Sequence, residues 1–171
     1  MQLVYDVAHN IAKIEQHKVK ELDDDECSSV SNKSLIVHRK GATRAFPEGS
    51  EDIPTKYRRI GQPVIIPGSM GTASWLLVGG VNSMNLTFGS TAHGAGRTMS
   101  RAAAKRMYPS YEMVKNELES KGIYIKSLTK RGILEEVPAA YKDVDVIATI
   151  SHNLGIATRV ARLVPLGVIK G

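Results

Sequence analysis

The stretch STAHGAGRTMSRAAAKR (residues 90–106) sets one histidine among small residues, directly ahead of a glycine-rich turn and a run of basic side chains. We expect this turn to lead into a helix over roughly residues 98–107, which stops near Pro109. Glycines let the backbone approach an anion closely, and a helix N-terminus favours negative charge. The stretch therefore predicts a phosphate site with the imidazole of His93 at its mouth.

His93 has two interpretations on these residues alone. An unprotonated imidazole beside a phosphate site is a nucleophile toward phosphorus, which would divide one phosphoryl transfer into two easier steps. The more common alternative is a structural turn residue that happens to precede Gly94 and Gly96.

Three basic residues follow the turn at four-residue intervals, Arg97, Arg101 and Lys105. This spacing predicts one basic helix face. Such a face suits a phosphate chain or an RNA backbone. The alternative is a solvated charged surface.

A second loop of small residues, PGSMGTAS (residues 67–74), carries hydroxyls at Ser69, Thr72 and Ser74. Hydroxyls and backbone amides in such a loop can bind a nucleotide base or phosphate. A tight β-turn is the alternative.

The 171 residues are 42% hydrophobic and 23% charged, which is typical of one globular domain. No segment approaches the ~20 apolar residues of a membrane span, and the first ten residues lack a signal-peptide pattern. The single Cys27 has no partner for an internal disulfide, so we expect a cytoplasmic protein. The net charge of +6 favours a polyanionic partner such as RNA, although basic proteins without one are common.

Helical and extended patterns are mixed without a βαβ rhythm, which predicts an α+β fold. Leu3, Val7 and Ile11 recur at four-residue spacing, so we expect an amphipathic helix over residues 2–17 with His9 outside its apolar arc. The chain would then begin inside a helix, which suggests the later part of a longer protein. Further along we expect a polar loop or hairpin tip over residues 18–34, two strands around a Pro-Gly turn over residues 64–80, and an irregular loop over residues 82–97. A helix over residues 111–121 would be capped by Ser110 and ended by Gly122, and a strand would follow over residues 123–128. The last elements are a helix over residues 140–163, with a weak point at Gly155, and a strand over residues 167–171.

Six blocks together resemble the C-terminal part of the RtcB family of GTP- and manganese-dependent RNA ligases. In the family's order they are DVAHN (6–10), HRKGATRAFP (38–47), GQPVIIPGSMGTAS (61–74), GSTAHGAGRTMSR (89–101), AYKDVD (140–145) and GVIKG (167–171). The resemblance covers residues 1–171 and implies mixed sheets flanked by helices. It also implies that these residues are the C-terminal part of the ligase catalytic domain, without its N-terminal part.

The resemblance implies a reaction that joins RNA ending in a 2′,3′-cyclic phosphate or 3′-phosphate to RNA with a 5′-hydroxyl. A histidine that matches His93 is first guanylylated by GTP, and the GMP then moves to the RNA 3′-phosphate. The implied cofactors are GTP and Mn²⁺. The implied partners are tRNA halves, as in tRNA splicing and RNA repair, the N-terminal portion of the enzyme as a separate chain, and an archease-like activator.

The resemblance also implies the residues of the site. The GTP-binding residues that match are His9, Asn10, Pro67, Gly68, Ser69, Met70, Ser74, His93, Gly94, Ala95, Gly96, Tyr141 and Lys170. Of the family's metal ligands, His9 alone finds a match.

The sequence departs from the family in an acidic insertion over residues 21–34 and at Trp75, where a tyrosine is usual. The family's cysteine, aspartate and remaining metal histidines have no match here, and Cys27 corresponds to none of them. We therefore expect the isolated chain to be inactive and to need the N-terminal portion. The alternatives are a non-catalytic module that binds RNA or a nucleotide, and a GTP-independent phosphatase that uses His93.

Overall fold

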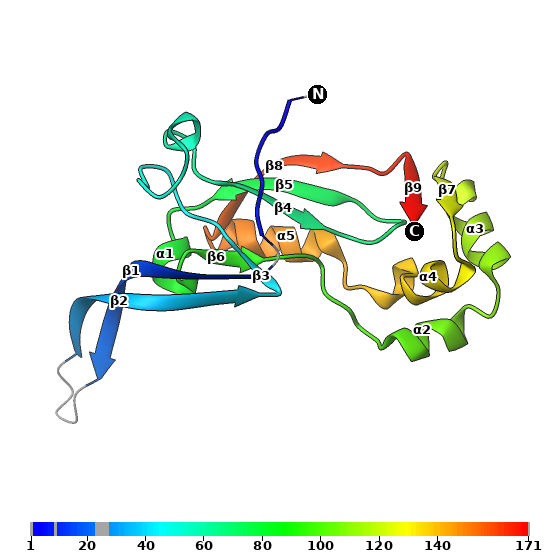
Figure 1. Ribbon diagram of the computed structural model, residues 1–171, viewed down its shortest axis with the longest axis horizontal. Coiled ribbons are helices and arrows are strands. Elements are labelled where there is room, and N and C mark those ends of the chain that lie inside the picture. The colour runs from blue at the N-terminus through cyan, green and yellow to red at the C-terminus, as the bar shows by residue number, and fades with distance from the viewer. Residues whose placement is uncertain (1, 9, 23–27, 171) are drawn as a thin grey trace. The chain divides into compact units, whose positions relative to one another are not determined.

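The fold consists of two compact units, and each gathers separate segments of the chain. The computed structural model describes residues 2–8, 10–22 and 28–170 (Figure 1). Unit 1 comprises residues 1–64, 77–93 and 150–159, and unit 2 comprises residues 65–76, 94–149 and 160–171.

A long antiparallel hairpin is the main element of unit 1 (Figure 1). Its strands are β1 (Asn10–Leu22) and β2 (Ser28–Lys40), with Asn10 opposite Lys40 and Ile14 opposite Ile36. Side chains alternate between the two faces of a strand. One face buries Glu15, His17 and Arg39, whereas Ile14 and Ile36 on the other face are exposed. The hairpin thus buries charge and exposes apolar side chains.

Short elements complete unit 1. Strand β3 (Ala42–Arg44) pairs antiparallel with β6 (Ser90–Ala92), and the unit also holds the 3₁₀ turn η1 (Thr55–Tyr57) and helix α1 (Ser83–Thr87). Its buried apolar residues include Ala45, Phe46, Ile53 and Leu77.

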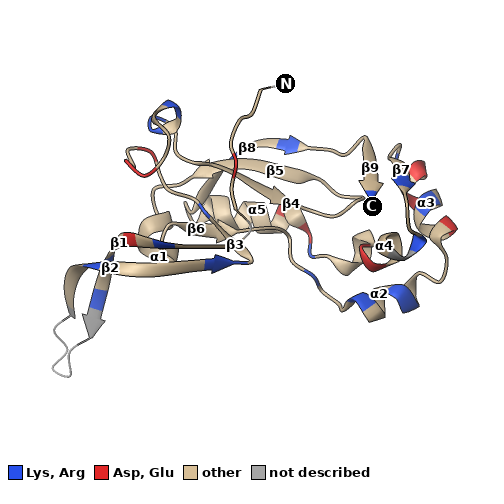
Figure 2. Cartoon of the chain, viewed as in Figure 1, with Lys and Arg blue, Asp and Glu red and all other residues tan. Residues whose placement is uncertain are grey.

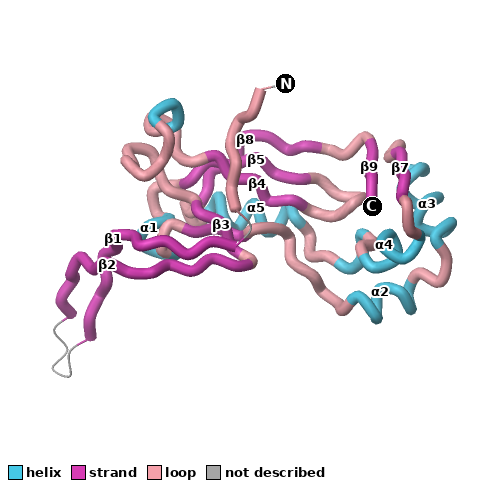
Figure 3. The backbone as a smooth tube through the Cα atoms, viewed as in Figure 1, coloured by secondary structure: helices cyan, strands magenta, loops and turns pink. Residues whose placement is uncertain are grey.

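Three helices and a parallel strand pair form most of unit 2 (Figure 3). They are α2 (Arg101–Met107), α3 (Tyr111–Ser120), β7 (Tyr124–Ser127), α4 (Lys130–Glu135) and β9 (Gly167–Lys170), with the 3₁₀ turn η2 (Pro138–Ala140). Their apolar side chains form one core, which contains Met70, Ala104, Val114, Leu118, Ile123, Ile125, Ile133, Val137 and Ala140. Tyr108 and Tyr141 pack against this core from its edge.

Four further elements have residues in both units. Strands β4 (Pro63–Pro67), β5 (Ser74–Gly79) and β8 (Ala157–Leu163) form a three-stranded sheet in the order β4-β5-β8, and the fourth element is α5 (Val144–Asn153). The mixture of small sheets and short helices confirms the α+β prediction. None of the helices in the part of the chain that the structure describes combines the length and apolar character that a membrane crossing requires.

Several expected elements are confirmed where the local signal is strong. Helix α3 begins after Ser110, whose hydroxyl accepts from the Met113 amide, and it is followed by Gly122 at φ 75°. The strands around residues 68–73, the strand near residues 124–127 and the last strand are also present.

Other expectations are wrong. Residues 2–8 have no regular secondary structure and residues 10–22 form a strand, so the helix expected over residues 2–17 is absent from the described residues. The helix expected over residues 140–163 is only α5, because Gly155 at φ 68° turns the chain into β8. The loop expected over residues 82–97 contains α1 and β6.

Candidate nucleotide pocket and the adjoining charged network

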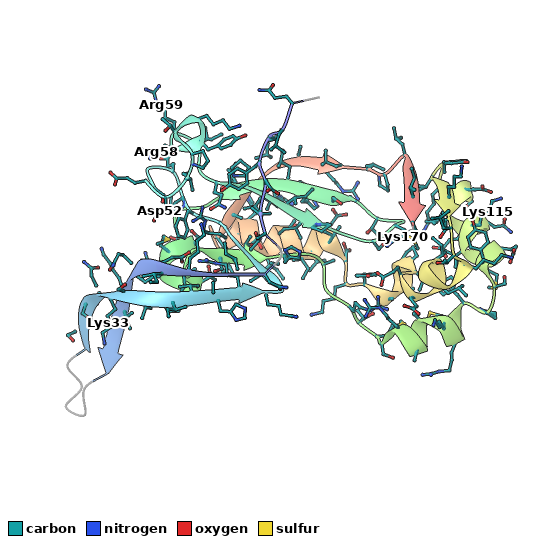
Figure 4. The ribbon with its side chains drawn as sticks, in the orientation of Figure 1. Lys33, Asp52, Arg58, Arg59, Lys115 and Lys170 are labelled. Atoms are coloured by element: carbon teal, nitrogen blue, oxygen red, sulfur yellow. The ribbon has the colours of Figure 1, made fainter. Side chains whose placement is uncertain are left out.

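A pocket of about 260 Å³ in unit 2 brings together residues that are far apart in the sequence. Its lining is Pro67, Gly68, Ser69, Met70, Ser74, Glu136, Tyr141 and Lys170. All of these except Glu136 are among the GTP-binding residues predicted from the sequence. Lys170 lies on β9, near the chain's C-terminal end (Figure 4). That the pocket binds GTP stays a prediction.

The loop between β4 and β5 forms one rim of the pocket, and its shape depends on Gly68. A Cβ there would lie 2.2 Å from the carbonyl oxygen of Ala73, so only glycine fits. The Thr72 hydroxyl accepts from the Ser69 amide at 2.7 Å and lies 3.0 Å from the Ser69 hydroxyl. Thr72 therefore holds the turn, which leaves Ser69 and Ser74 as the hydroxyls that line the pocket.

The glycine turn after His93 is held by the protein's own backbone. The Ala95 amide donates to the Pro67 oxygen at 2.9 Å, and the Thr98 amide donates to the Ala140 oxygen at 2.8 Å. Helix α2 begins only at Arg101, has seven residues, and is capped by the Ser100 hydroxyl. The helix expected over roughly residues 98–107 is thus present as α2, but three residues separate it from Arg97, so the glycine turn does not lead directly into its N-terminus.

His93 is half-buried and ends the second segment of unit 1. Its amide donates to the Gly41 oxygen at 3.3 Å. It directly precedes Gly94, where a Cβ would lie 3.4 Å from the oxygen of Pro67 on the pocket rim.

Tyr141 is joined to Glu136 and Arg97 at the pocket. The Tyr141 hydroxyl donates to Glu136 Oε2, and Arg97 Nη1 lies 3.3 Å from Glu136 Oε1 and 3.1 Å from the Tyr141 hydroxyl. The Arg97 guanidinium carbon lies 5.0 Å from the centre of the Tyr141 ring, within cation–π range. Burial raises the pKa of Tyr141, and the Glu136 carboxylate raises it further, while Arg97 opposes both.

The other two predicted phosphate ligands are also ion-paired. Lys105 Nζ lies 2.6 Å from Glu135 Oε1, and Arg101 Nε lies 3.4 Å from Glu136 Oε1. In Figure 2, α2 carries basic positions and the neighbouring α4 carries acidic ones, and the contact between them is the ion pair of Lys105 with Glu135. Arg97 precedes the helix, so the prediction of one helix face for all three is wrong.

Comparison with known proteins identifies the family. The sequence profile described as tRNA-splicing ligase RtcB matches residues 1–171. The chain belongs to the RtcB family. Relatives named tRNA-splicing ligase RtcB are 54% identical in Pyrobaculum aerophilum, 53% in Nanoarchaeum equitans and 52% in Thermococcus kodakarensis, each over all 171 residues of this chain. These matches cover 34%, 34% and 33% of the relatives, so the chain spans about a third of their length.

Manganese is expected from the sequence resemblance, with His9 as its ligand in this chain. No three His, Cys, Asp or Glu residues gather into a metal site within residues 2–8, 10–22 and 28–170. The predicted ligand His9 and the single Cys27 both lie outside the described residues. Asn10, which follows His9 in the sequence, begins β1. The described residues therefore do not fit a manganese ion by themselves.

Sequence reasoning missed Glu136. The resemblance to the RtcB family supplied Tyr141 and Lys170 but no acidic residue beside them. The available signal was the Glu135–Glu136 pair, which in a chain with so many basic residues near residue 100 is a natural ion-pair partner.

Proposed function

We propose that this chain supplies the nucleotide-binding part of a GTP-dependent RNA ligase that acts in tRNA splicing, together with the N-terminal portion of the RtcB sequence. The substrates are RNA with a 2′,3′-cyclic phosphate or 3′-phosphate and RNA with a 5′-hydroxyl. The observation that carries the proposal is the pocket of unit 2, in which residues from the 67–74 loop, Tyr141 and Lys170 meet.

Each kind of group in the pocket suits a part of GTP. The Tyr141 ring offers an aromatic surface to the base, and Lys170 offers an ammonium donor. The hydroxyls of Ser69 and Ser74 are hydrogen-bonding groups for polar atoms of the nucleotide. His93 lies next in sequence to Gly94, beside the rim residue Pro67.

The proposed reaction uses His93 as the nucleophile. An imidazole nitrogen attacks the α-phosphorus of GTP, a P–N bond forms, and pyrophosphate leaves with the electrons of the broken P–O bond while the ring proton goes to solvent. A 2′,3′-cyclic phosphate end is first opened by water to a 3′-phosphate. An oxygen of the RNA 3′-phosphate then attacks the phosphorus of the bound GMP, and the electrons of the broken P–N bond return to the imidazole of His93. Finally the 5′-hydroxyl oxygen attacks the activated 3′-phosphate, its proton is lost, and GMP leaves as the phosphodiester forms.

Manganese remains part of the proposal, with His9 as its ligand in this chain and the other ligands in the N-terminal portion. We assign it no step, because no metal site is formed by the residues that the structure describes. An archease-like activator is a further proposed partner.

The test is covalent labelling. GTP labelled at the α-phosphate is incubated with Mn²⁺ and the chain supplemented with the N-terminal portion of a relative. We expect protein-bound label that is lost in acid and stable to hydroxylamine, as a phosphoramidate is. His93→Ala should abolish the label. His38→Ala, at an exposed position of β2, should retain it.

The outcomes separate the alternatives. Full labelling of His93→Ala would refute His93 as the nucleophile. Binding of GTP without any label in the wild-type protein would instead favour the non-catalytic module.

A further inference from the structure

The side chain of Arg97 makes its polar contacts with the protein itself. Nε donates to the Met99 oxygen at 3.1 Å, Nη2 donates to the Glu135 oxygen at 2.8 Å, and Nη1 contacts both Glu136 and Tyr141. The side chain is only 23% exposed. An RNA phosphate would have to displace these contacts, which would leave the Glu136 carboxylate and the two carbonyl oxygens without their donor. Arg97 is therefore poorly suited to the RNA contact that its spacing suggested.

Glu136 occupies the centre of this network. One carboxylate oxygen accepts from Tyr141 and the other faces Arg97, so the carboxylate fixes both partners at once. Charge-assisted hydrogen bonds of this kind are stronger than neutral ones. Glu136 also lines the pocket beside Tyr141.

The backbone also fixes Arg97 and Tyr141 relative to each other. Arg97 and Tyr141 form an antiparallel bridge, the Lys142 amide donates to the Gly96 oxygen at 2.9 Å, and Ala95 reaches Pro67 on the opposite rim. The segment 95–98 thus connects the two rims of the pocket. Side-chain and backbone contacts both hold Tyr141 in one orientation.

We propose that Glu136 and Arg97 are positioning residues that hold Tyr141 against the nucleotide, rather than contacts to RNA. The proposal rests on the function proposed above, since it assumes that the pocket binds GTP. If the Tyr141 ring is already fixed, GTP binding does not have to order it, and the entropy cost of binding is smaller.

The chain contains a matched control in Tyr108, Glu117 and Lys121. The Tyr108 hydroxyl donates to Glu117 Oε2 at 3.0 Å, and Lys121 Nζ lies 2.9 Å from Glu117 Oε1. Tyr108 packs on the same core as Tyr141 but does not line the pocket. This second Tyr–Glu–cation group has the same kinds of contact but holds no residue that lines the pocket.

The experiment measures GTP affinity of the chain supplemented with the N-terminal portion, by calorimetry. We expect Glu136→Gln and Tyr141→Phe each to weaken GTP binding by roughly three- to tenfold. The double variant should bind GTP no more weakly than the single variant with the lower affinity, because each single substitution already removes the contact between Glu136 and Tyr141. Glu117→Gln and Tyr108→Phe should change the affinity by less than about twofold.

A second measurement separates positioning from RNA binding. Arg97→Met removes both the charge and the planar fork, so it should weaken GTP binding but leave the salt dependence of RNA binding unchanged if Arg97 contacts no RNA phosphate. Fully additive effects of Glu136→Gln and Tyr141→Phe, unchanged or tighter GTP binding by Glu136→Gln, or a flattened salt dependence in Arg97→Met would each overturn the proposal. If Tyr141→Ala leaves GTP affinity unchanged, the proposed pocket itself is wrong and the positioning role falls with it.

Discussion

Arg39 is the residue on which the buried face of the β1–β2 hairpin depends. Its guanidinium nitrogens Nη1 and Nη2 each lie 2.7 Å from an oxygen of Glu15, and Nε donates to the Ser90 hydroxyl at 2.8 Å. His17 Nε2 lies 3.0 Å from Glu15 Oε2. Burial by itself would raise the pKa of Glu15, but the hydrogen bonds and charges of Arg39 and His17 outweigh it and lower the pKa. Glu15 is therefore ionised in the folded protein.

Replacing Arg39 should destabilise the fold strongly. Arg39→Met leaves the Glu15 carboxylate buried without its main partner, and breaking a buried pair costs about 3–5 kcal/mol. Urea unfolding near neutral pH measures the loss. Arg59→Met, at an exposed position, should stay within about 0.5 kcal/mol of wild type.

The free energy of unfolding that Arg39→Met loses should become smaller as the pH falls. In the wild type the lowered pKa of Glu15 contributes stability above its unfolded value near 4.5, and that contribution is lost as the pH falls through the folded pKa. In Arg39→Met only His17 still opposes burial, so we expect the pKa of Glu15 to be higher than in the wild type and less stability to be lost on acidification. The difference between the two proteins should shrink between pH 6 and pH 4. A constant or growing difference over that range would contradict the role given to Arg39.

At the scale of elements, helix α2 presents Arg101 and Lys105 beside the end of α4. The Arg101 side chain is 66% exposed, whereas that of Lys105 is 33% exposed, so Arg101 is open to solvent and Lys105 is half-buried. Exposed ion pairs contribute little stability. We therefore expect an RNA phosphate to replace the carboxylate at small cost at Arg101 and at a larger cost at Lys105.

We expect Lys105→Ala to weaken RNA binding modestly and to reduce the slope of log K against log[salt] by about 0.7–0.9. The readout is a salt titration of RNA affinity. Lys115→Ala, which removes a helical lysine paired with Glu119 on α3, should leave the slope unchanged. An unchanged slope in Lys105→Ala would show that Lys105 serves only the contact with Glu135.

The elements differ in how far the sequence predicts them, for physical reasons. Helix α3 has a serine cap, an apolar stripe and a terminal glycine, which are all local signals. The strand β1 was missed because its buried face carries Glu15 and His17, so the expected alternation of apolar and polar residues is inverted. Their burial depends on Arg39 from the other strand, and the residue pattern of β1 alone cannot indicate a partner on β2.

At the scale of the whole molecule, the pocket joins the 67–74 loop, Tyr141 and the last strand, and no periodicity predicts that meeting. The predicted pocket residues came from the resemblance to the RtcB family, which carries long-range information that composition and spacing lack. The sequence offers Glu136 only as an ion-pair partner, because its position beside Tyr141 comes from two contacts, with Arg97 and Tyr141, that exist only in the folded chain.

The largest prediction is that residues 1–171 do not ligate RNA by themselves. A divalent ion needs several protein ligands to be held in a fixed geometry, and no such group gathers in the described parts of the chain. The chain also spans only about a third of the relatives in which the activity is named. Incubation with GTP, Mn²⁺ and an RNA pair bearing 3′-phosphate and 5′-hydroxyl ends should therefore give no joined product.

Adding the N-terminal portion of a relative as a separate chain should restore joining, because it would supply the remaining ligands and nucleotide contacts. The same mixture with His93→Ala should remain inactive, which ties the restored activity to this chain rather than to the added portion. Gel separation of end-labelled RNA measures both results. Efficient joining by residues 1–171 alone would mean that the metal is held by His9 together with other side chains of this chain, and the division of the site between two parts would be wrong.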